Sequence, residues 1–274
     1  MSSETPRVES AAARRLYWVP GAGLRTGAHP RSPILVADSW LVSEGKVRAL
    51  ERHRDRFSRS CADAGADEDT VCAFWEAAVG ALPRSGAWFP RVELLDGERF
   101  PLSLLIRPAP QRGPLVRVHP WRGADPRRRP RVKGPDLAAL AEVREQASRV
   151  GAEEALLLSP SGLVTDSTAS ALLWWDNGEL CVPSPHLDVL PSVTAGLLTE
   201  QARERGVRVN TCYYPLDHLD GRETWLVNAL AGIRVVSEWR GSEVRPGPAP
   251  QAQQWRDYLE SLRRPLPETG PRAG

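Results

Sequence analysis

The sequence is poor in lysine and in long apolar runs. Only Lys46 and Lys133 are lysines among its 36 basic residues. No run of eighteen apolar residues occurs, so we expect no membrane-spanning helix and no membrane partner. The first residues lack an apolar core followed by a cleavage site of small residues, so we predict no secretion signal. Together these absences predict a cytoplasmic protein.

Metal-binding patterns of cysteine and histidine are also missing. The four cysteines are widely spaced, with no Cys-x-x-Cys pair, and the five histidines show no ligand spacing. We therefore expect no disulfide framework, no zinc site and no catalytic metal.

One stretch of the chain is rich in arginine, with Arg127 to Arg129 followed by Arg131. The net charge is only +2 and acidic residues are spread along the chain, so we expect no nucleic-acid partner. Two interpretations stay open for this loop. It either attracts the carboxylates of a substrate, or it is a solvated loop whose arginines reflect coding bias.

The scarcity of lysine makes the two that remain informative. An amine that must lose its proton and form an imine cannot be replaced by a guanidinium, which stays charged. Lys46 follows Glu44-Gly45 in a turn between two apolar segments and is interpreted as a solvated turn residue. Lys133 is therefore the candidate for chemistry.

The first half of the chain mixes short strands and helices. Strand patterns occupy residues 33–37 and 40–42, with a turn at Glu44-Gly45. Helical spacing covers residues 47–64, with Leu50, Phe57 and Cys61 on one face, and Asp69 is the predicted cap of a second helix to residue 82. A β-hairpin is predicted over residues 92–106.

Elements alternate more regularly in the second half. Residues 107–130 are rich in proline, glycine and arginine and are predicted to connect two domains. Asp136 is the predicted cap of a helix to residue 150. Strands are then predicted at 155–158, 163–165, 171–175, 180–182, 207–214, 224–227 and 233–236, and helices at 194–204 and 251–263. We predict an α+β protein with a small N-terminal α/β domain, residues 1–112, and a larger C-terminal mixed domain, residues 113–274.

Five short segments in a fixed order carry a family resemblance. They are His53–Phe57, Val132–Leu137, Gly162–Ala171, Val189–Thr194 and Leu226–Val236. Together they resemble the class IV aminotransferases, the fold-type IV enzymes that use pyridoxal 5'-phosphate (PLP), from about Val36 to Glu238. The resemblance implies the two-domain fold of that family, PLP as cofactor, a small amino substrate and a homodimer.

The resemblance assigns a role to three ionisable side chains. Lys133 matches the Schiff-base lysine that carries PLP, whose amine moves protons once the substrate has displaced it. Asp166 stands where the family has the glutamate that pairs with the pyridine nitrogen, and it is one methylene shorter. Arg56 matches the arginine that grips the cofactor phosphate. Lys133 and Asp166 are thus the predicted catalytic residues.

Further cofactor contacts follow from the last two segments. Val193 and Thr194 begin a predicted helix whose backbone N–H groups and hydroxyl would bind the phosphate. Asn228 and Ala229 belong to the segment that closes the cofactor site in the family. The chain departs from the family pattern at Ser192, where glycine is usual, and at Ala171, where asparagine is usual.

The reaction is predicted less sharply than the cofactor. The Asn228-Ala229-Leu230 form is closer to the 4-amino-4-deoxychorismate lyases, which release pyruvate, and this is the main prediction. Ser39, Arg107 and Arg117 are weaker candidates for substrate binding. The alternatives are a class IV aminotransferase acting on an amino acid or a specialised amino compound, and a non-catalytic homologue that has lost PLP.

Overall fold

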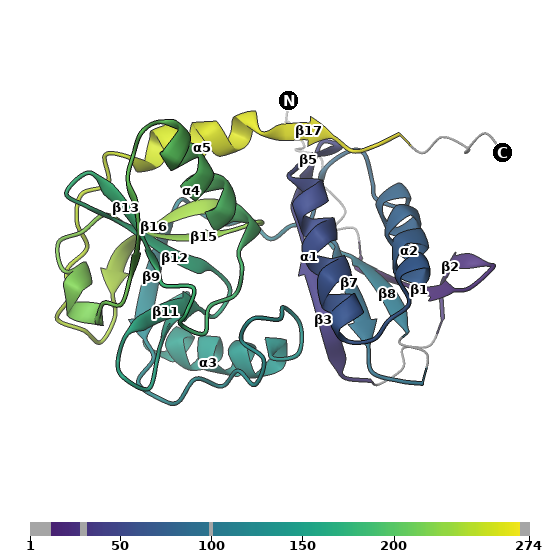
Figure 1. Ribbon diagram of the computed structural model, residues 1–274, viewed down its shortest axis with the longest axis horizontal. Helices are drawn as coiled ribbons and strands as arrows, with labels where there is room; N and C mark the ends of the chain where they lie inside the picture. Colours follow the sequence, from purple (N-terminus) through teal and green to yellow (C-terminus); the bar gives the residue numbers. More distant parts are fainter. Residues whose placement is uncertain (1–11, 28–31, 99–100, 269–274) are drawn as a thin grey trace, which may run out of the picture.

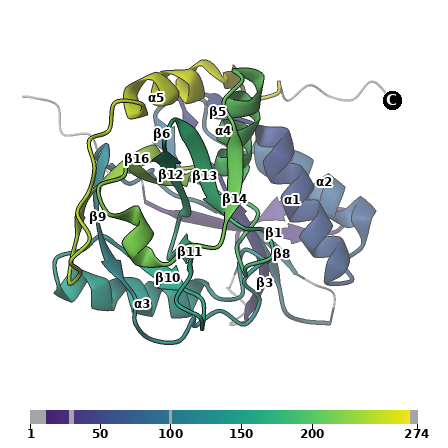
Figure 2. The ribbon, with the colours of Figure 1, turned by 60° about the vertical axis from the view of Figure 1, so that its left-hand side comes forward.

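The computed structural model describes residues 12–27, 32–98 and 101–268, and its N-terminal part is built on a five-stranded antiparallel sheet. The strand order is β2-β1-β8-β7-β3. Figures 1 and 2 show helices α1 and α2 side by side on one face of this sheet. The elements are β1 (Arg14–Val19), β2 (Gly23–Arg25), β3 (Ile34–Ser39), β4 (Val42–Ser43), β5 (Lys46–Arg48), α1 (Leu50–Asp63), α2 (Glu68–Gly80), β6 (Ala87–Trp88), β7 (Arg91–Leu95) and β8 (Leu102–Ile106).

The C-terminal part is built on an eight-stranded mixed sheet in the order β11-β10-β9-β16-β15-β12-β13-β14. Helices α4 and α5 pack together, away from α3 (Figure 1). The elements are β9 (Leu115–Pro120), α3 (Leu137–Arg149), β10 (Glu154–Leu158), β11 (Val164–Ser167), β12 (Ala171–Asp176), β13 (Glu179–Pro183), α4 (Val193–Glu204), β14 (Val209–Cys212), the 3-10 helix η1 (Leu216–Leu219), β15 (Thr224–Asn228), β16 (Gly232–Trp239), α5 (Ala252–Ser261) and β17 (Arg263–Pro265).

Aromatic side chains fill both cores. Phe57 of α1 and Phe74 of α2 are fully buried in the N-terminal part, where their rings pack against each other. Trp225 and Trp255 pack between the large sheet and helix α5. Each buried aromatic ring removes a large apolar area from water, which stabilises the two parts separately.

The last strand ties the two parts together. Strand β17 follows α5 and pairs with β5, so that the C-terminal segment adds a strand to the small sheet β17-β5-β4-β6 (Figure 1). Leu266 then enters the N-terminal core and is 3% exposed. The predicted boundary between residues 112 and 113 stays a prediction, and the structure adds this return of the chain to the N-terminal part.

The α+β class is confirmed, and four local predictions need correction. The first helix begins at Leu50 rather than residue 47, because Lys46–Arg48 pairs on both sides as β5. The second helix is capped by Asp67 rather than Asp69, since the Asp67 carboxylate accepts the Thr70 N–H at 2.8 Å.

Asp136 precedes α3 as predicted, but its carboxylate accepts the backbone N–H of Arg129 instead of capping the helix. The predicted connection 107–130 contains β9, which lies between β10 and β16 and is parallel to both. Val116 and Val118 of β9 are fully buried, so this short strand belongs to the centre of the large sheet. The tip of the predicted hairpin at residues 99–100 lies outside the described residues.

In the part of the chain that the structure describes, no helix is both long enough and apolar enough to cross a membrane.

Candidate active site

Lys133 lies in the turn that leads into α3, packed against strand β3 of the N-terminal part. Its carbonyl accepts the backbone N–H of Ala37 at 2.7 Å. Among the described residues, its amine forms no hydrogen bond or ion pair. Burial, followed by the nearby charge of Arg56, lowers the pKa of Lys133 from its usual 10.5 to about 8, although Asp38 opposes the shift. A substantial fraction of this amine is therefore neutral near pH 8, the form that acts as a nucleophile.

Gly134 allows this close approach of the lysine turn to β3. A Cβ atom at this position would lie 2.6 Å from the Ala37 nitrogen and 2.8 Å from the Val36 carbonyl carbon. The φ angle of Gly134 is +132°, a conformation that other residues rarely adopt. The glycine therefore permits the backbone contact that places Lys133 between the two parts of the molecule.

A buried ion cluster stands beside the lysine turn. Asp38 of β3 is 0% exposed and accepts hydrogen bonds from Arg56 Nε at 2.8 Å and Nη2 at 2.9 Å. His53 Nδ1 lies 2.8 Å from the same carboxylate, and the Ser39 N–H donates to it at 2.7 Å. Burial alone would raise the pKa of Asp38, but Arg56 and His53 hold that pKa well below its usual range. Asp38 is thus an anion that neutralises Arg56.

Arg56 also reaches the C-terminal part. Its Nη1 donates to the Pro191 carbonyl at 2.9 Å. A guanidinium has five N–H donors, so the three bonds to Asp38 and Pro191 leave two donors for another oxygen. Arg56 can therefore make the predicted phosphate contact while its hydrogen bonds to Asp38 remain in place.

Asp166 of β11 is buried and belongs to a second ion cluster. Its Oδ2 atom accepts the Arg127 Nη1 donor at 2.8 Å and the Leu190 N–H at 2.7 Å. Among the described residues, its other oxygen, Oδ1, accepts no hydrogen bond. Burial raises the pKa of Asp166 to about 6, although Arg127 opposes that shift. One oxygen of this carboxylate, Oδ1, is therefore free to accept a hydrogen bond from the N–H group of a ring.

The segment Asp188–Pro191 joins the two clusters. The Leu190 N–H donates to Asp166, and the carbonyl of the next residue, Pro191, accepts a hydrogen bond from Arg56. The Asp188 carbonyl accepts from Arg127 Nη2 at 2.7 Å. Four consecutive residues thus connect the predicted phosphate-binding arginine to the predicted ring partner.

Helix α4 begins directly after this segment and faces the N-terminal part. Ser192 is its N-cap, and its hydroxyl accepts the Ala195 N–H at 3.2 Å. Ser192 has a φ angle of −87°, so the position does not require the glycine that is usual in the family. Val193 and Thr194 occupy the first turn, where backbone N–H groups have no partner within the helix.

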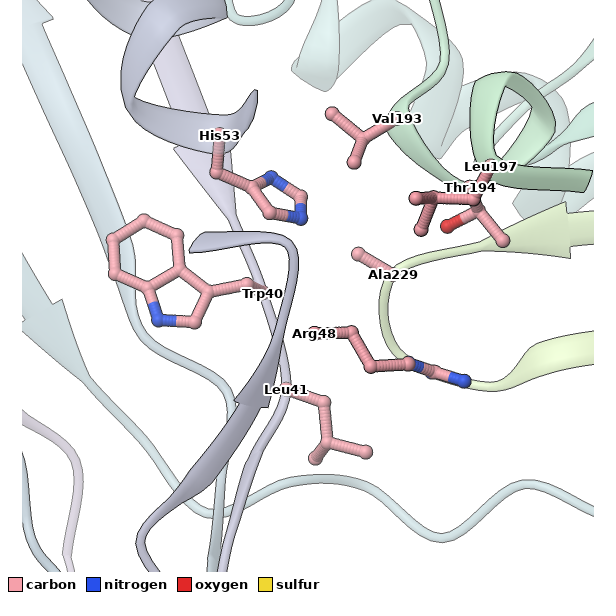
Figure 3. A pocket seen from close by; sticks show the side chains of 8 residues that line it. All are labelled: Trp40, Leu41, Arg48, His53, Val193, Thr194, Leu197 and Ala229. Carbon is pink, nitrogen blue, oxygen red and sulfur yellow. The ribbon is translucent and has the colours of Figure 1, made fainter. Parts of the chain in front are cut away.

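A small cavity marks where α4 meets the N-terminal part. Its volume is about 10 Å³, which suits one water molecule and not a cofactor. Its lining comes from both parts of the molecule: Trp40, Leu41, Arg48 and His53 from one, and Val193, Thr194, Leu197 and Ala229 from the other (Figure 3).

The Asn228 side chain organises the turn between β15 and β16. Its amide oxygen accepts the backbone N–H groups of Leu230 and Ala231, and its nitrogen donates to the Ser170 hydroxyl at 2.9 Å. The Asn228 amide oxygen is therefore engaged by the backbone of the turn that contains Ala229. Any contact of Asn228 with a cofactor stays a prediction.

No hydrogen bond or ion pair between described residues joins the three predicted substrate residues to one another. Arg107 is half-buried, makes no ion pair with a described residue, and is among the cations that lower the pKa of Lys133. Ser39 ends β3 and pairs in register with Arg91. Arg117 lies on β9 with its guanidinium 3.8 Å from Glu153.

The available donors fit PLP. An aldehyde needs an uncommitted amine, which Lys133 supplies, and a protonated ring nitrogen needs an anionic oxygen, which Asp166 Oδ1 supplies. A phosphate needs N–H donors, which Arg56 and the first turn of α4 supply. Within the described residues, no group of three or more histidine, cysteine, aspartate or glutamate side chains is arranged to hold a metal ion.

Comparison with known proteins identifies the family. The sequence profile of the family described as amino-transferase class IV matches residues 35–239. The chain belongs to the class IV aminotransferase family. It is thus an enzyme of a PLP-dependent family, and the family resemblance of the five sequence segments is confirmed. A search of curated proteins found no match.

Solved structures share the fold at low sequence identity. A hypothetical aminotransferase from Mycobacterium tuberculosis in its PLP-bound form is 18% identical, with a TM-score of 0.71 and coverage of 91% of this chain and 98% of that chain. The branched-chain amino acid aminotransferase of Escherichia coli is 17% identical, with a TM-score of 0.75 and coverage of 94% and 97%. A protein assigned as a 4-amino-4-deoxychorismate lyase from Legionella pneumophila is 17% identical, with a TM-score of 0.73 and coverage of 86% and 96%.

Sequence patterns assigned no role to Asp38 or Asp125, and they marked Arg127 only as part of the arginine-rich loop. Asp38 and Arg127 are the partners of Arg56 and Asp166, and Asp125 in turn holds Arg127. Asp38 lies in a strand that otherwise reads as apolar, and a lone acid in such a strand is a signal of a buried ion pair. Arg127 had no distinguishing signal, because it stands in a run of three arginines.

Proposed function

We propose that the protein is a PLP-dependent aminotransferase that acts on an amino acid or a related amino compound. The observation that carries the proposal is the uncommitted, partly buried amine of Lys133, with a pKa lowered to about 8, at the junction of the two parts. PLP, when bound, supplies the electron sink for removal of a proton from the substrate carbon next to nitrogen. The Lys133 amine, once free, is the base that this proton transfer requires.

The direct test uses the scarcity of lysine. Borohydride reduction of the yellow holoprotein should fix the cofactor to the peptide that contains Lys133, which mass spectrometry would locate. Lys46→Arg is the matched control, because it removes the only other lysine and lies on an exposed position of β5. We expect Lys46→Arg to label fully and Lys133→Arg to label not at all. A colourless protein that takes up no PLP would contradict the proposal and support the non-catalytic alternative.

Substrate recognition is assigned to Arg107. Its guanidinium donates to the Phe89 carbonyl at 3.0 Å and lies 5.0 Å from the centre of the Phe89 ring. Nearby Arg91 differs, because Glu93 binds it at 2.5 and 2.6 Å and neutralises it. A half-buried cation without an acidic partner suits a substrate carboxylate. We expect Arg107→Gln to raise KM for a dicarboxylic substrate about tenfold or more, with a smaller effect on an apolar amino acid.

The lyase reaction is the second candidate, supported by the Asn228-Ala229-Leu230 segment. The two reactions separate in one assay. A lyase would convert aminodeoxychorismate to pyruvate and 4-aminobenzoate with no keto acid added. An aminotransferase would require an α-keto acid as acceptor and would transfer the amino group of its donor to it. The comparisons support the aminotransferase better, because the matching family is described as amino-transferase class IV and several of the similar structures are aminotransferases, against one assigned as a lyase.

The family resemblance also supports a homodimer. Light scattering coupled to size-exclusion chromatography should give about twice the chain mass of 30.2 kDa. A monomer that binds PLP and turns over substrate would contradict the dimer without affecting the proposed reaction.

A further inference from the structure

The Asp166 cluster contains a third charged residue, Asp125, whose position suggests a function. Asp125 grips Arg127 from the side opposite to Asp166. Its Oδ2 atom accepts Arg127 Nη2 at 2.7 Å, and its two oxygens lie 3.0 and 3.1 Å from Arg127 Nε. The remaining nitrogen, Nη1, is directed to Asp166 at 2.8 Å. One guanidinium is thus shared between two carboxylates.

The charges of this cluster do not cancel. Arg127 carries one positive charge, and Asp125 and Asp166 carry one negative charge each when ionised, which leaves a single negative charge. The side chains of Arg127 and Asp166 are 5% and 7% exposed, so this charge is poorly screened by water. Without Asp125, Arg127 would neutralise Asp166, and the pair would offer little attraction to a protonated ring nitrogen.

We propose that Asp125 and Arg127 are positioning residues that orient Asp166 and keep the cluster anionic toward the pyridine nitrogen of PLP. The inference rests on the proposed function, because it requires PLP at the Lys133 amine. It concerns a position where the chain departs from the family pattern. Aspartate is one methylene shorter than the usual glutamate, and Arg127 with the Leu190 N–H holds Oδ2 so that Oδ1 stays uncommitted.

The groups that face Asp166 act in opposite directions. Burial raises the pKa of Asp166, Arg127 and the Leu190 N–H lower it, and Asp125 raises it slightly. Arg127 is therefore needed to keep Asp166 ionised near neutral pH. Asp125 neutralises Arg127 in turn, so that Arg127 does not cancel the negative charge of Asp166. Arg127 also lies six positions before Lys133 in the same loop, so one loop carries the lysine and orients the ring partner.

The test measures binding of PLP and of its 1-deaza analogue, in which carbon replaces the ring nitrogen. Each would be titrated into the cofactor-free protein and followed by absorbance. We expect the wild-type protein to prefer PLP by about tenfold, the size of one charge-assisted hydrogen bond. In Asp125→Asn the preference should fall below about twofold, while Asp125→Glu should retain it.

The control is Asp188→Asn, which removes a negative charge from the same neighbourhood. Asp188 contacts Arg127 only through its backbone carbonyl, and its side chain is exposed. We expect this variant to keep the wild-type preference. Urea unfolding of each variant would verify that the fold is intact.

The outcomes separate the two proposals. If wild-type protein binds no PLP, the proposed function fails. If it binds PLP but Asp125→Asn weakens both ligands equally, Asp125 has only a structural role and the inference is overturned. An unchanged preference for PLP in Asp125→Asn would overturn it as well.

Discussion

Asp38 and Asp166 are both buried aspartates that bind an arginine, yet their pKa values are shifted in opposite directions from the usual value of an aspartate. The pKa of Asp38 is held well below its usual range, whereas burial raises that of Asp166 to about 6. Asp38 receives two bonds from Arg56 and further bonds from His53 and the Ser39 N–H. Asp166 receives one bond from an arginine that also binds Asp125, and one from a backbone N–H.

The difference shows how the surroundings of one residue type set its function. Four hydrogen bonds saturate Asp38 and make it a structural anion that fixes Arg56. Asp166 is bound on one oxygen only, so its charge is maintained but incompletely compensated. A carboxylate of the first kind supports stability, and one of the second kind is available to a ligand.

The largest expected effect is that of Asp38→Asn on stability. The change leaves Arg56 without its buried counter-charge, so we expect the free energy of unfolding to fall by about 3 to 5 kcal/mol. Urea unfolding at pH 7 would measure this. Asp63→Asn, at an exposed position of the same helix as Arg56, is the control and should change stability by less than about 0.5 kcal/mol. A similar small loss for both variants would remove the distinction between the two aspartates.

Asp166→Asn should stabilise the protein relative to wild type as pH rises, whereas Asp38→Asn destabilises it. A pKa raised from 3.8 to about 6 means that folded wild-type protein binds this proton more tightly than the unfolded chain does. Its contribution to stability is therefore present below pH 3.8 and is lost as pH rises through about 6. Across that window the variant should gain up to about 3 kcal/mol relative to wild type.

Unfolding of the cofactor-free wild type and Asp166→Asn between pH 4 and pH 8 would test this expectation. A stability difference that does not change with pH would mean that Asp166 titrates at its ordinary value.

Gly134→Ala should disturb the contact that brings the lysine turn close to Asp38. The added Cβ would lie 2.6 Å from the Ala37 nitrogen, so we expect a loss of about 2 kcal/mol and weaker PLP binding. Gly206→Ala is the matched control, because Gly206 also has a positive φ, of +74°, but no atom within 4 Å of an added Cβ. Equal losses in thermal unfolding would show that backbone strain, and not the close approach, dominates at Gly134.

The smallest effect is expected at Ser192, near the segment that joins the two clusters. Ser192→Ala removes the N-cap hydrogen bond to Ala195 and should lower the free energy of unfolding by about 1 kcal/mol. Ser192→Gly, which restores the residue usual in the family, should lower it by only a few tenths of a kcal/mol. Urea unfolding of both variants is the measurement, and equal losses would show that the cap bond contributes little.

The sequence alone predicted the elements with strong periodicity and the residues with irreplaceable chemistry. Phe57 and Cys61 were predicted to share one face of a helix and are 0% exposed on α1, because the 3.6-residue repeat is local information. Lys133 could be singled out because a guanidinium cannot do the work of an amine. The family followed from ordered segments, as the profile match over residues 35–239 confirms.

Other features depended on residues far apart in the chain. Strand β17 pairs with β5 more than two hundred positions earlier, so neither strand can be recognised from its own residues. Arg127 was one arginine among three until the fold placed it between Asp125 and Asp166.

The prediction that Lys133 carries the cofactor therefore came from the sequence, because among the lysines only Lys133 has matching neighbours along the chain. How acidic Asp38 and Asp166 are was decided by the tertiary structure. Burial and the number of donors around each carboxylate set its pKa, and those donors come from segments that only folding brings together.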